Sequence, residues 1–129
     1  MNVHVINGTT HHVETDAQGA IARCIQECHS CAQACDRVAD TCLGNRPSLI
    51  QCIRHTLDCA EICMATGAIA NRRIGENRAV VKVVMEACAV ACAACAAECA
   101  KHVGNEACLA CAIAGRKCAR ACSQAAALL

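Results

Sequence analysis

The chain has 129 residues, which is enough for one packed domain and too little for two. Its 16 cysteines exceed the content of ordinary intracellular enzymes, and the absence of Phe, Tyr and Trp excludes binding of single-stranded nucleic acid by base stacking. Lys and Arg total 12 against 11 Asp and Glu, so the formal charge of +1 gives no strongly basic surface for nucleic acid or an anionic membrane.

Residues 1–16 are expected to form a tail or an extended arm, since they have no helical repeat of apolar residues and include Gly8. They contain neither a basic segment followed by an apolar one nor a twin arginine, so we expect a cytoplasmic protein without an export signal. The longest apolar stretch, residues 87–97, is shorter than the ~18 residues that cross a bilayer, and no membrane span is expected. In the reducing cytoplasm, so many thiols indicate metal binding rather than disulfides.

Residues 17–129 are expected to form a single all-α domain, because alanine is frequent and Pro47 is the only proline. Polar segments that contain glycine predict helix breaks at residues 44–47, 71–77 and 104–105, the last with Asn105 as a helix N-cap. Four helices are therefore predicted, near residues 17–43, 47–71, 76–103 and 105–127. Because the connections are short, neighbouring helices should run antiparallel and form an up-down four-helix bundle.

The cysteines follow a regular spacing, since consecutive cysteines on each predicted helix are 3, 4 or 7 residues apart. This spacing places side chains on one helix face, which a bundle buries in its core. Sixteen thiols are thus expected to line the core and to bind metal: Cys24, Cys28, Cys31, Cys35, Cys42, Cys52, Cys59, Cys63, Cys88, Cys92, Cys95, Cys99, Cys108, Cys111, Cys118 and Cys122. Thr56 and Gly115 interrupt the pattern at positions where a cysteine could have stood.

An inert thiol core and a disulfide scaffold are the structural alternatives to metal binding. An inert core would pack weakly and oxidise readily, because alanine is the usual neighbour of these cysteines. A disulfide scaffold would pair its thiols at random, because each one has several partners at equal spacing on its own helix. Both alternatives are therefore less favoured than a metal.

Charge balance favours copper(I) as that metal. About sixteen Cu(I) ions in place of sixteen thiol protons leave the core near neutral, and thiolate is the ligand that Cu(I) prefers. Zinc at four cysteines per site would leave a charge of about −8 in the core. Side chains three or four residues apart bring their sulfurs within about two metal–sulfur bonds of ~2.3 Å, which suits a two-coordinate bridging ion. Tetrahedral sites need four thiolates from neighbouring helices, an arrangement that the spacing within one helix does not indicate.

Over residues 17–127 the pattern resembles the bacterial copper storage proteins, and specifically their cytosolic members. Its strongest part is the doubled Cys-x-x-x-Cys-x-x-Cys-x-x-x-Cys motif at Cys24–Cys35 and Cys88–Cys99. The resemblance implies a homotetramer of bundles, each of which holds many Cu(I) ions along its axis, mostly between pairs of thiolates, as a copper store. The departures at Thr56 and Gly115 imply a capacity below that of the fullest members.

The two ends of the bundle are expected to differ. One end collects an apolar plug: Ala20, Ile21, Ile69, Val80, Val81, Val84, Met85, Leu128 and Leu129. The other collects Cys42, Cys52, Cys99, Cys108 and His102. Similarity to cytosolic family members implies that His102, three residues after Cys99, binds copper at an open end, and the alternative is a solvated histidine at a helix C-terminus. Met85 is in register with the cysteines, but packing is its favoured role.

The other histidines are weaker candidates as ligands. His55 competes with Thr56 for one inward position, His29 is expected at the surface, and His4, His11 and His12 lie in the expected tail. We predict a copper storage and detoxification protein rather than an enzyme, because no nucleophile–base–acid set is present. A zinc or mixed-metal thiolate buffer and an iron–sulfur electron carrier are the alternatives, although the usual iron–sulfur motif lies in loops and ends in Cys-Pro.

Overall fold

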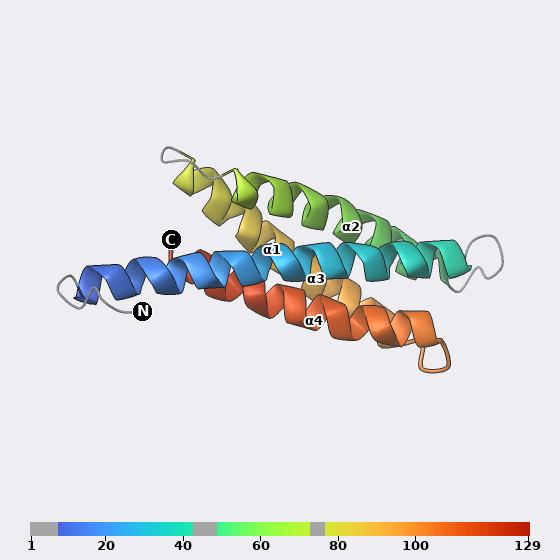
Figure 1. Ribbon diagram of the computed structural model, residues 1–129. Coiled ribbons are helices and arrows are strands. Elements are labelled where there is room, and N and C mark those ends of the chain that lie inside the picture. Colours follow the sequence, from blue (N-terminus) through green and yellow to red (C-terminus); the bar gives the residue numbers. More distant parts are fainter. Residues whose placement is uncertain (1–7, 43–48, 73–76) are drawn as a thin grey trace.

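Four α-helices make up nearly all of the described chain, which comprises residues 8–42, 49–72 and 77–129 of a computed structural model (Figure 1). The helices are α1 (Gly8–Cys42), α2 (Ile50–Asn71), α3 (Arg78–Cys99) and α4 (Glu106–Ala127). Each helix packs against two neighbours, in the ring order α1, α2, α3, α4 and back to α1. Neighbours run in opposite directions (Figure 1). The predicted antiparallel up-down four-helix bundle is confirmed.

The first helix begins earlier than its sequence suggests. The prediction that residues 1–16 form a tail without helix is wrong from Gly8 onward, and residues 1–7 lie outside the described part. A helix needs no apolar stripe where it has no neighbour to bury it, so periodicity alone could not locate this start. The N-terminal end of α1 extends beyond the C-terminal end of α4 (Figure 1).

The turn between α3 and α4 also differs from expectation. α3 ends at Cys99 rather than near residue 103. The backbone amides of Lys101 and His102 donate to the carbonyls of Glu98 and Cys99, three residues back, which tightens the chain out of the α-helix. The predicted N-cap of α4 is confirmed, because Asn105 Oδ1 accepts a hydrogen bond of 3.0 Å from the Cys108 amide.

Small side chains allow the helices to pack closely around the cysteines. Alanines beside the cysteine positions are buried between neighbouring helices: Ala32, Ala60, Ala89, Ala96, Ala112 and Ala121. A core without aromatic residues fills little space, so its contacts depend on short distances between backbones. The sulfurs of all four helices consequently lie close to one another in the core.

One end of the core is closed by larger apolar side chains. Ile21, Val81 and Met85 are each 3% exposed or less, and the buried Thr66 hydroxyl donates to the Val84 carbonyl at 3.4 Å. Met85 is therefore a packing residue, as predicted. Val80 and Leu128, which the plug was expected to include, are 56% and 42% exposed, so that part of the prediction is wrong. Their positions turn them away from the bundle axis.

The α3 helix is long and apolar enough to cross a membrane, judged by length and composition alone. A helix that packs in the centre of a bundle meets the same criterion. Here Cys88, Cys92, Cys95 and Cys99 of α3 are buried against the other three helices. One third of the apolar segment of α3 is buried in this way, and Val80, Val83 and Val90 on the same helix are exposed.

Candidate metal centre

All sixteen cysteines point into the bundle, as their spacing predicts. Cys42 is 4% exposed and the others are completely buried, and every thiol is free of disulfide bonds. They form a column that begins at Cys24 and Cys122, next to the closed end, and finishes at Cys42 and Cys108 at the opposite end. This is an unusual core, because a row of soft ligand atoms occupies the positions where leucine normally packs.

The closest sulfur pairs mostly join different helices. Cys24 and Cys122 Sγ are 3.3 Å apart, Cys63 and Cys92 Sγ 3.5 Å, and Cys35 and Cys111 Sγ 3.6 Å. Close pairs four residues apart on one helix also occur, with separations of 3.8 to 3.9 Å. The spacing within single helices indicated only the second kind of pair. Heptad spacing tells which face is buried but not how the helices are offset along the axis.

The middle of the column contains sets of four thiols from neighbouring helices. In each set the Sγ atoms all lie within 4.8 Å of one another: Cys28, Cys88, Cys118 and Cys122; Cys31, Cys59, Cys63 and Cys92; and Cys63, Cys88, Cys92 and Cys118. The third set shares two thiols with each of the others, so the sites are not independent. Shared thiolates suit bridged clusters of several ions better than isolated tetrahedral sites. The donor set therefore fits soft ions held together in clusters by bridging thiolates.

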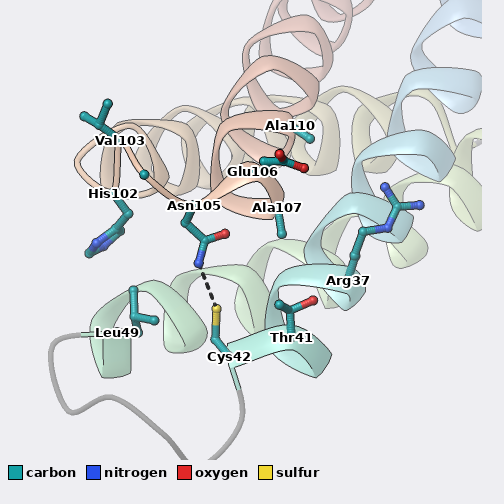
Figure 2. A pocket seen from close by; sticks show the side chains of 11 residues that line it. Arg37, Thr41, Cys42, Leu49, His102, Val103, Asn105, Glu106, Ala107 and Ala110 are labelled. Atoms are coloured by element: carbon teal, nitrogen blue, oxygen red, sulfur yellow. Dashed lines mark hydrogen bonds between the residues drawn. The ribbon is translucent and has the colours of Figure 1, made fainter.

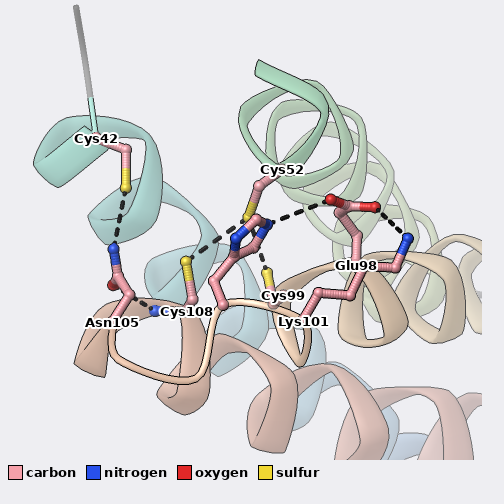
Figure 3. Close-up of polar contacts among 8 residues, drawn as sticks. Cys42, Cys52, Glu98, Cys99, Lys101, Asn105 and Cys108 are labelled. Carbon is pink, nitrogen blue, oxygen red and sulfur yellow. Dashed lines mark hydrogen bonds and ion pairs between the residues drawn. The ribbon is translucent and has the colours of Figure 1, made fainter. Parts of the chain in front are cut away.

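A smaller set of thiols lies at the open end of the column, which we call the entrance (Figure 3). Cys52 Sγ is 3.5 Å from Cys99 Sγ and 3.7 Å from Cys108 Sγ. Asn105 Nδ2 donates to Cys42 Sγ at 3.6 Å while its Oδ1 caps α4. The entrance thus combines four thiols from all four helices.

Burial favours the protonated form of two entrance thiols, Cys52 and Cys108. It raises the pKa of Cys52, and it raises that of Cys108 from 9.0 to about 12, because a thiolate loses its hydration in the core. Hydrogen bonding to Cys111 and Cys95 raises the pKa of Cys99. A cation that binds these thiols must therefore displace their protons. It binds tightly only if it prefers thiolate to water strongly.

Comparison with known proteins identifies the family. A sequence model of the copper storage protein family matches residues 17–127. This chain belongs to the copper storage protein family. A cytosolic copper storage protein from Streptomyces lividans, solved during copper loading with five coppers, is 47% identical, with a TM-score of 0.81 over 88% of this chain and 97% of that one.

Two further structures give the same result. The Streptomyces lividans protein loaded with 10 copper equivalents is 45% identical, with a TM-score of 0.83 over 91% of each chain. The Cu(I)-bound copper storage protein from Bacillus subtilis is 32% identical, with a TM-score of 0.75 over 83% of this chain and 98% of that one. A search of curated protein sequences gave no match.

In this copper storage protein, His102 lies beside the entrance rather than on α3. Its ring and Cys42 line the same cavity of about 830 Å³, together with Arg37 and Leu49 (Figure 2). His102 Nε2 lies 3.3 Å from Glu98 Oε2, and the same carboxylate binds the Lys101 ammonium at 3.2 Å. Hydrogen bonds from Lys101 and His102 lower the pKa of Glu98 despite its partial burial. The histidine is thus held at the opening of the column with its side chain 19% exposed.

The two departures from the cysteine pattern have different causes. Thr56 is fully buried, and its hydroxyl donates to the Ile53 carbonyl at 2.8 Å, so the position faces the core and has space for a thiol. The position of Gly115 has no space for the side chain of a cysteine. A Cβ there would lie 2.9 Å from the Cys92 carbonyl oxygen and 3.1 Å from Ala96 Cβ. The expectation that a cysteine could stand at residue 115 is therefore wrong, because the backbone of α3 occupies its place.

Two of the remaining histidines, His29 and His55, lie on described helices. His29 is exposed, as expected, and His55 is half-buried beside Thr56. His4 and the side chains of His11 and His12 lie outside the described part of the structure. The Cys-x-x-Cys pair Cys28–Cys31 lies in the middle of α1 and not in a loop, so the fold gives no support to the iron–sulfur alternative.

Sequence reasoning did not identify Asn105 and Val38 as parts of the site. Asn105 was predicted only as a cap, and its contact with Cys42 depends on the tight turn after α3. Val38 is completely buried between Cys35 and Cys42 on α1, in the same register as the cysteines. The spacing of four residues from Val38 to Cys42 was the available signal.

Proposed function

We propose that this chain stores copper(I) in its core, with about one ion for each of its sixteen thiols. The observation that carries the proposal is the continuous column of free, buried thiols in overlapping sets. Each ion replaces a thiol proton, so the core stays near neutral however full it is. We infer that the protein is a binding protein and not an enzyme, and that its role is to sequester copper.

The proposed ligands are the sixteen cysteines, with His102 at the entrance. The cavity that His102 shares with Cys42 supports this role, because it connects solvent to the open end of the column. An imidazole nitrogen is also a ligand that copper accepts. The opposite end offers no comparable path, since Ile21, Val81 and Met85 fill it. Copper therefore enters and leaves beside His102.

We also propose a cytosolic homotetramer. The Streptomyces lividans relative is described as cytosolic, which supports the same location here. On α2, exposed apolar side chains recur every seven residues at Ile50, Leu57 and Met64, the spacing of an interface between helices. Sedimentation should give a mass four times 13.4 kDa. The double substitution Leu57→Glu and Met64→Glu should give smaller species, whereas Asp58→Lys and Glu61→Lys on the adjacent exposed positions should not.

The storage function is tested by anaerobic titration of the reduced apoprotein with Cu(I) against a chromophoric Cu(I) chelator. We expect uptake to level off near 14–18 ions per chain, about one for each thiol. The double variant Cys24→Ser and Cys122→Ser should take up about two fewer ions, and Val90→Ser, at an exposed position, should take up the same number. A plateau at ~4 ions or fewer would refute storage and indicate tetrahedral zinc sites instead.

A further inference from the structure

The four helices do not carry thiols at equal intervals behind the entrance. On α3 the next thiol inward from Cys99 is Cys95, one turn away, and on α4 the next thiol inward from Cys108 is Cys111. On α1 and α2 the corresponding interval is two turns, from Cys42 to Cys35 and from Cys52 to Cys59. Directly behind the entrance, the thiols are therefore continuous on the α3–α4 side only, and further inward α4 has a two-turn interval of its own, from Cys111 to Cys118.

This difference matters because copper moves between thiolates by exchanging one ligand at a time. An ion that bridges two sulfurs spans about two bonds of ~2.3 Å, or ~4.6 Å. Seven residues of helix correspond to a rise of ~10.5 Å, which no single bridging ion can span. The positions within the gaps offer no substitute ligand, since Val38 is aliphatic and the Thr56 hydroxyl donates to the Ile53 carbonyl. Both side chains are completely buried and fill the gaps.

On the continuous side, one pair of thiols connects the two parts of the column. Cys95 and Cys111 Sγ are 3.9 Å apart, and Cys111 Sγ is 3.6 Å from Cys35 Sγ on the opposite side of the core. Cys95 also lies within 4.8 Å of Cys35 and Cys59, which lead to the interior sets. Toward the entrance, Cys95 lies one helical turn from Cys99 on α3, and Cys111 lies one turn from Cys108 on α4.

We propose that Cys95 and Cys111 form the relay through which copper passes from the four entrance thiols to the ten thiols further inward, and that Val38 and Thr56 seal the other half of the core. This inference rests on the storage function proposed above. It divides the store into two compartments that exchange at different rates. Copper at the entrance equilibrates with external ligands quickly, and interior copper must cross the relay.

The test compares two double variants that each lose two thiols. Cys95→Ser with Cys111→Ser removes the relay, and Cys24→Ser with Cys122→Ser removes the pair at the closed end, 3.3 Å apart. Transfer from a Cu(I)–chelator complex is followed by the loss of chelator colour in a stopped-flow instrument, after circular dichroism has established equal helical content. We expect equal capacities, but a slow phase at least about tenfold slower in the relay variant, the effect of ~1.4 kcal/mol of extra barrier.

Thr56→Cys provides an independent test, because it places a thiol within the gap on α2. In the relay variant it should restore the slow phase toward the rate of the unmodified protein, and in the unmodified protein it should accelerate filling of the interior. Equal rates in the two double variants would overturn the relay, and absence of any effect of Thr56→Cys would overturn the seal. Uptake limited to ~4 ions in the unmodified protein would refute storage itself, a separate result, and the relay with it.

Discussion

Substitution of Gly115 by alanine tests whether close contact between α3 and α4 holds the bundle together. In a helix interior this change normally stabilises a protein, because alanine has a helix propensity about 1 kcal/mol better than glycine. Here the added methyl group would lie 2.9 Å from the Cys92 carbonyl oxygen and 3.1 Å from Ala96 Cβ. Neither atom is the end of a flexible side chain, so the two helices must move apart.

The expected magnitude follows from these two opposing effects. Overpacking of a well-packed core costs about 1–3 kcal/mol, and the rigid neighbours at residue 115 place this site in the upper part of that range. After the gain in propensity, we expect Gly115→Ala to lower the free energy of unfolding by about 1–2 kcal/mol. Gly67→Ala is the matched control, since its Cβ would meet only Cys28 Cβ, at an ordinary distance of 3.9 Å. That variant should be more stable by about 1 kcal/mol.

Urea unfolding of the reduced apoprotein, followed by circular dichroism, measures both changes. Thermal unfolding should place the midpoint of Gly115→Ala roughly 3–8 °C below that of the unmodified protein and that of Gly67→Ala above it. If Gly115→Ala proved as stable as Gly67→Ala, the close approach of α3 and α4 would be wrong, and a cysteine could be accommodated at residue 115 after all.

Three other predictions concern the closed end, the turn and the thiols. Met85→Ala should cost about 2–5 kcal/mol in unfolding free energy, because the side chain is fully buried, and a copper capacity below that of the unmodified protein would contradict its role in packing. Asn105→Ala should cost about 1 kcal/mol through loss of the α4 cap, whereas Asn105→Ser keeps the cap and should show a smaller loss in the same unfolding assay. The pKa of Cys108 is raised from 9.0 to about 12, so its contribution to apoprotein stability is complete below pH 9 and disappears as the pH rises to 12. Unfolding free energies that stay constant from pH 9 to 11 would refute this assignment.

The sequence predicted the bundle and its thiol core because both depend on periodicity. Steps of three, four and seven residues give every cysteine the same helix face, and the structure buries all of them. Asn105 could also be identified as a cap, because capping depends only on the residues at one helix end. Inferences about which face of a single helix is buried were confirmed, whereas the ends of α1 and α3 were not predicted correctly.

Inferences that needed two helices could not be made in the same way. The partner of Cys63 is not only Cys59, four residues away, but also Cys92 at 3.5 Å, and that pairing depends on how α2 and α3 are offset along the axis. Gly115 looked like a missing cysteine until the carbonyl of Cys92 was placed beside it. The start of α1 at Gly8 lies beyond the packed region, where the apolar pattern carries no information.

The separation of the two ends explains how such a core can exist with and without metal. Structural zinc domains unfold when the metal is removed, because the ion supplies most of their folding free energy. Here the residues that pack independently of metal, such as Ile21, Val81 and Met85, close one end, and the alanines and Gly115 hold the helices together along their length. A thiol proton and a copper(I) ion carry the same charge, so exchange between them does not change the charge of the core. A store must release its contents without unfolding, and a bundle whose stability lies in the packing around its thiols meets that condition.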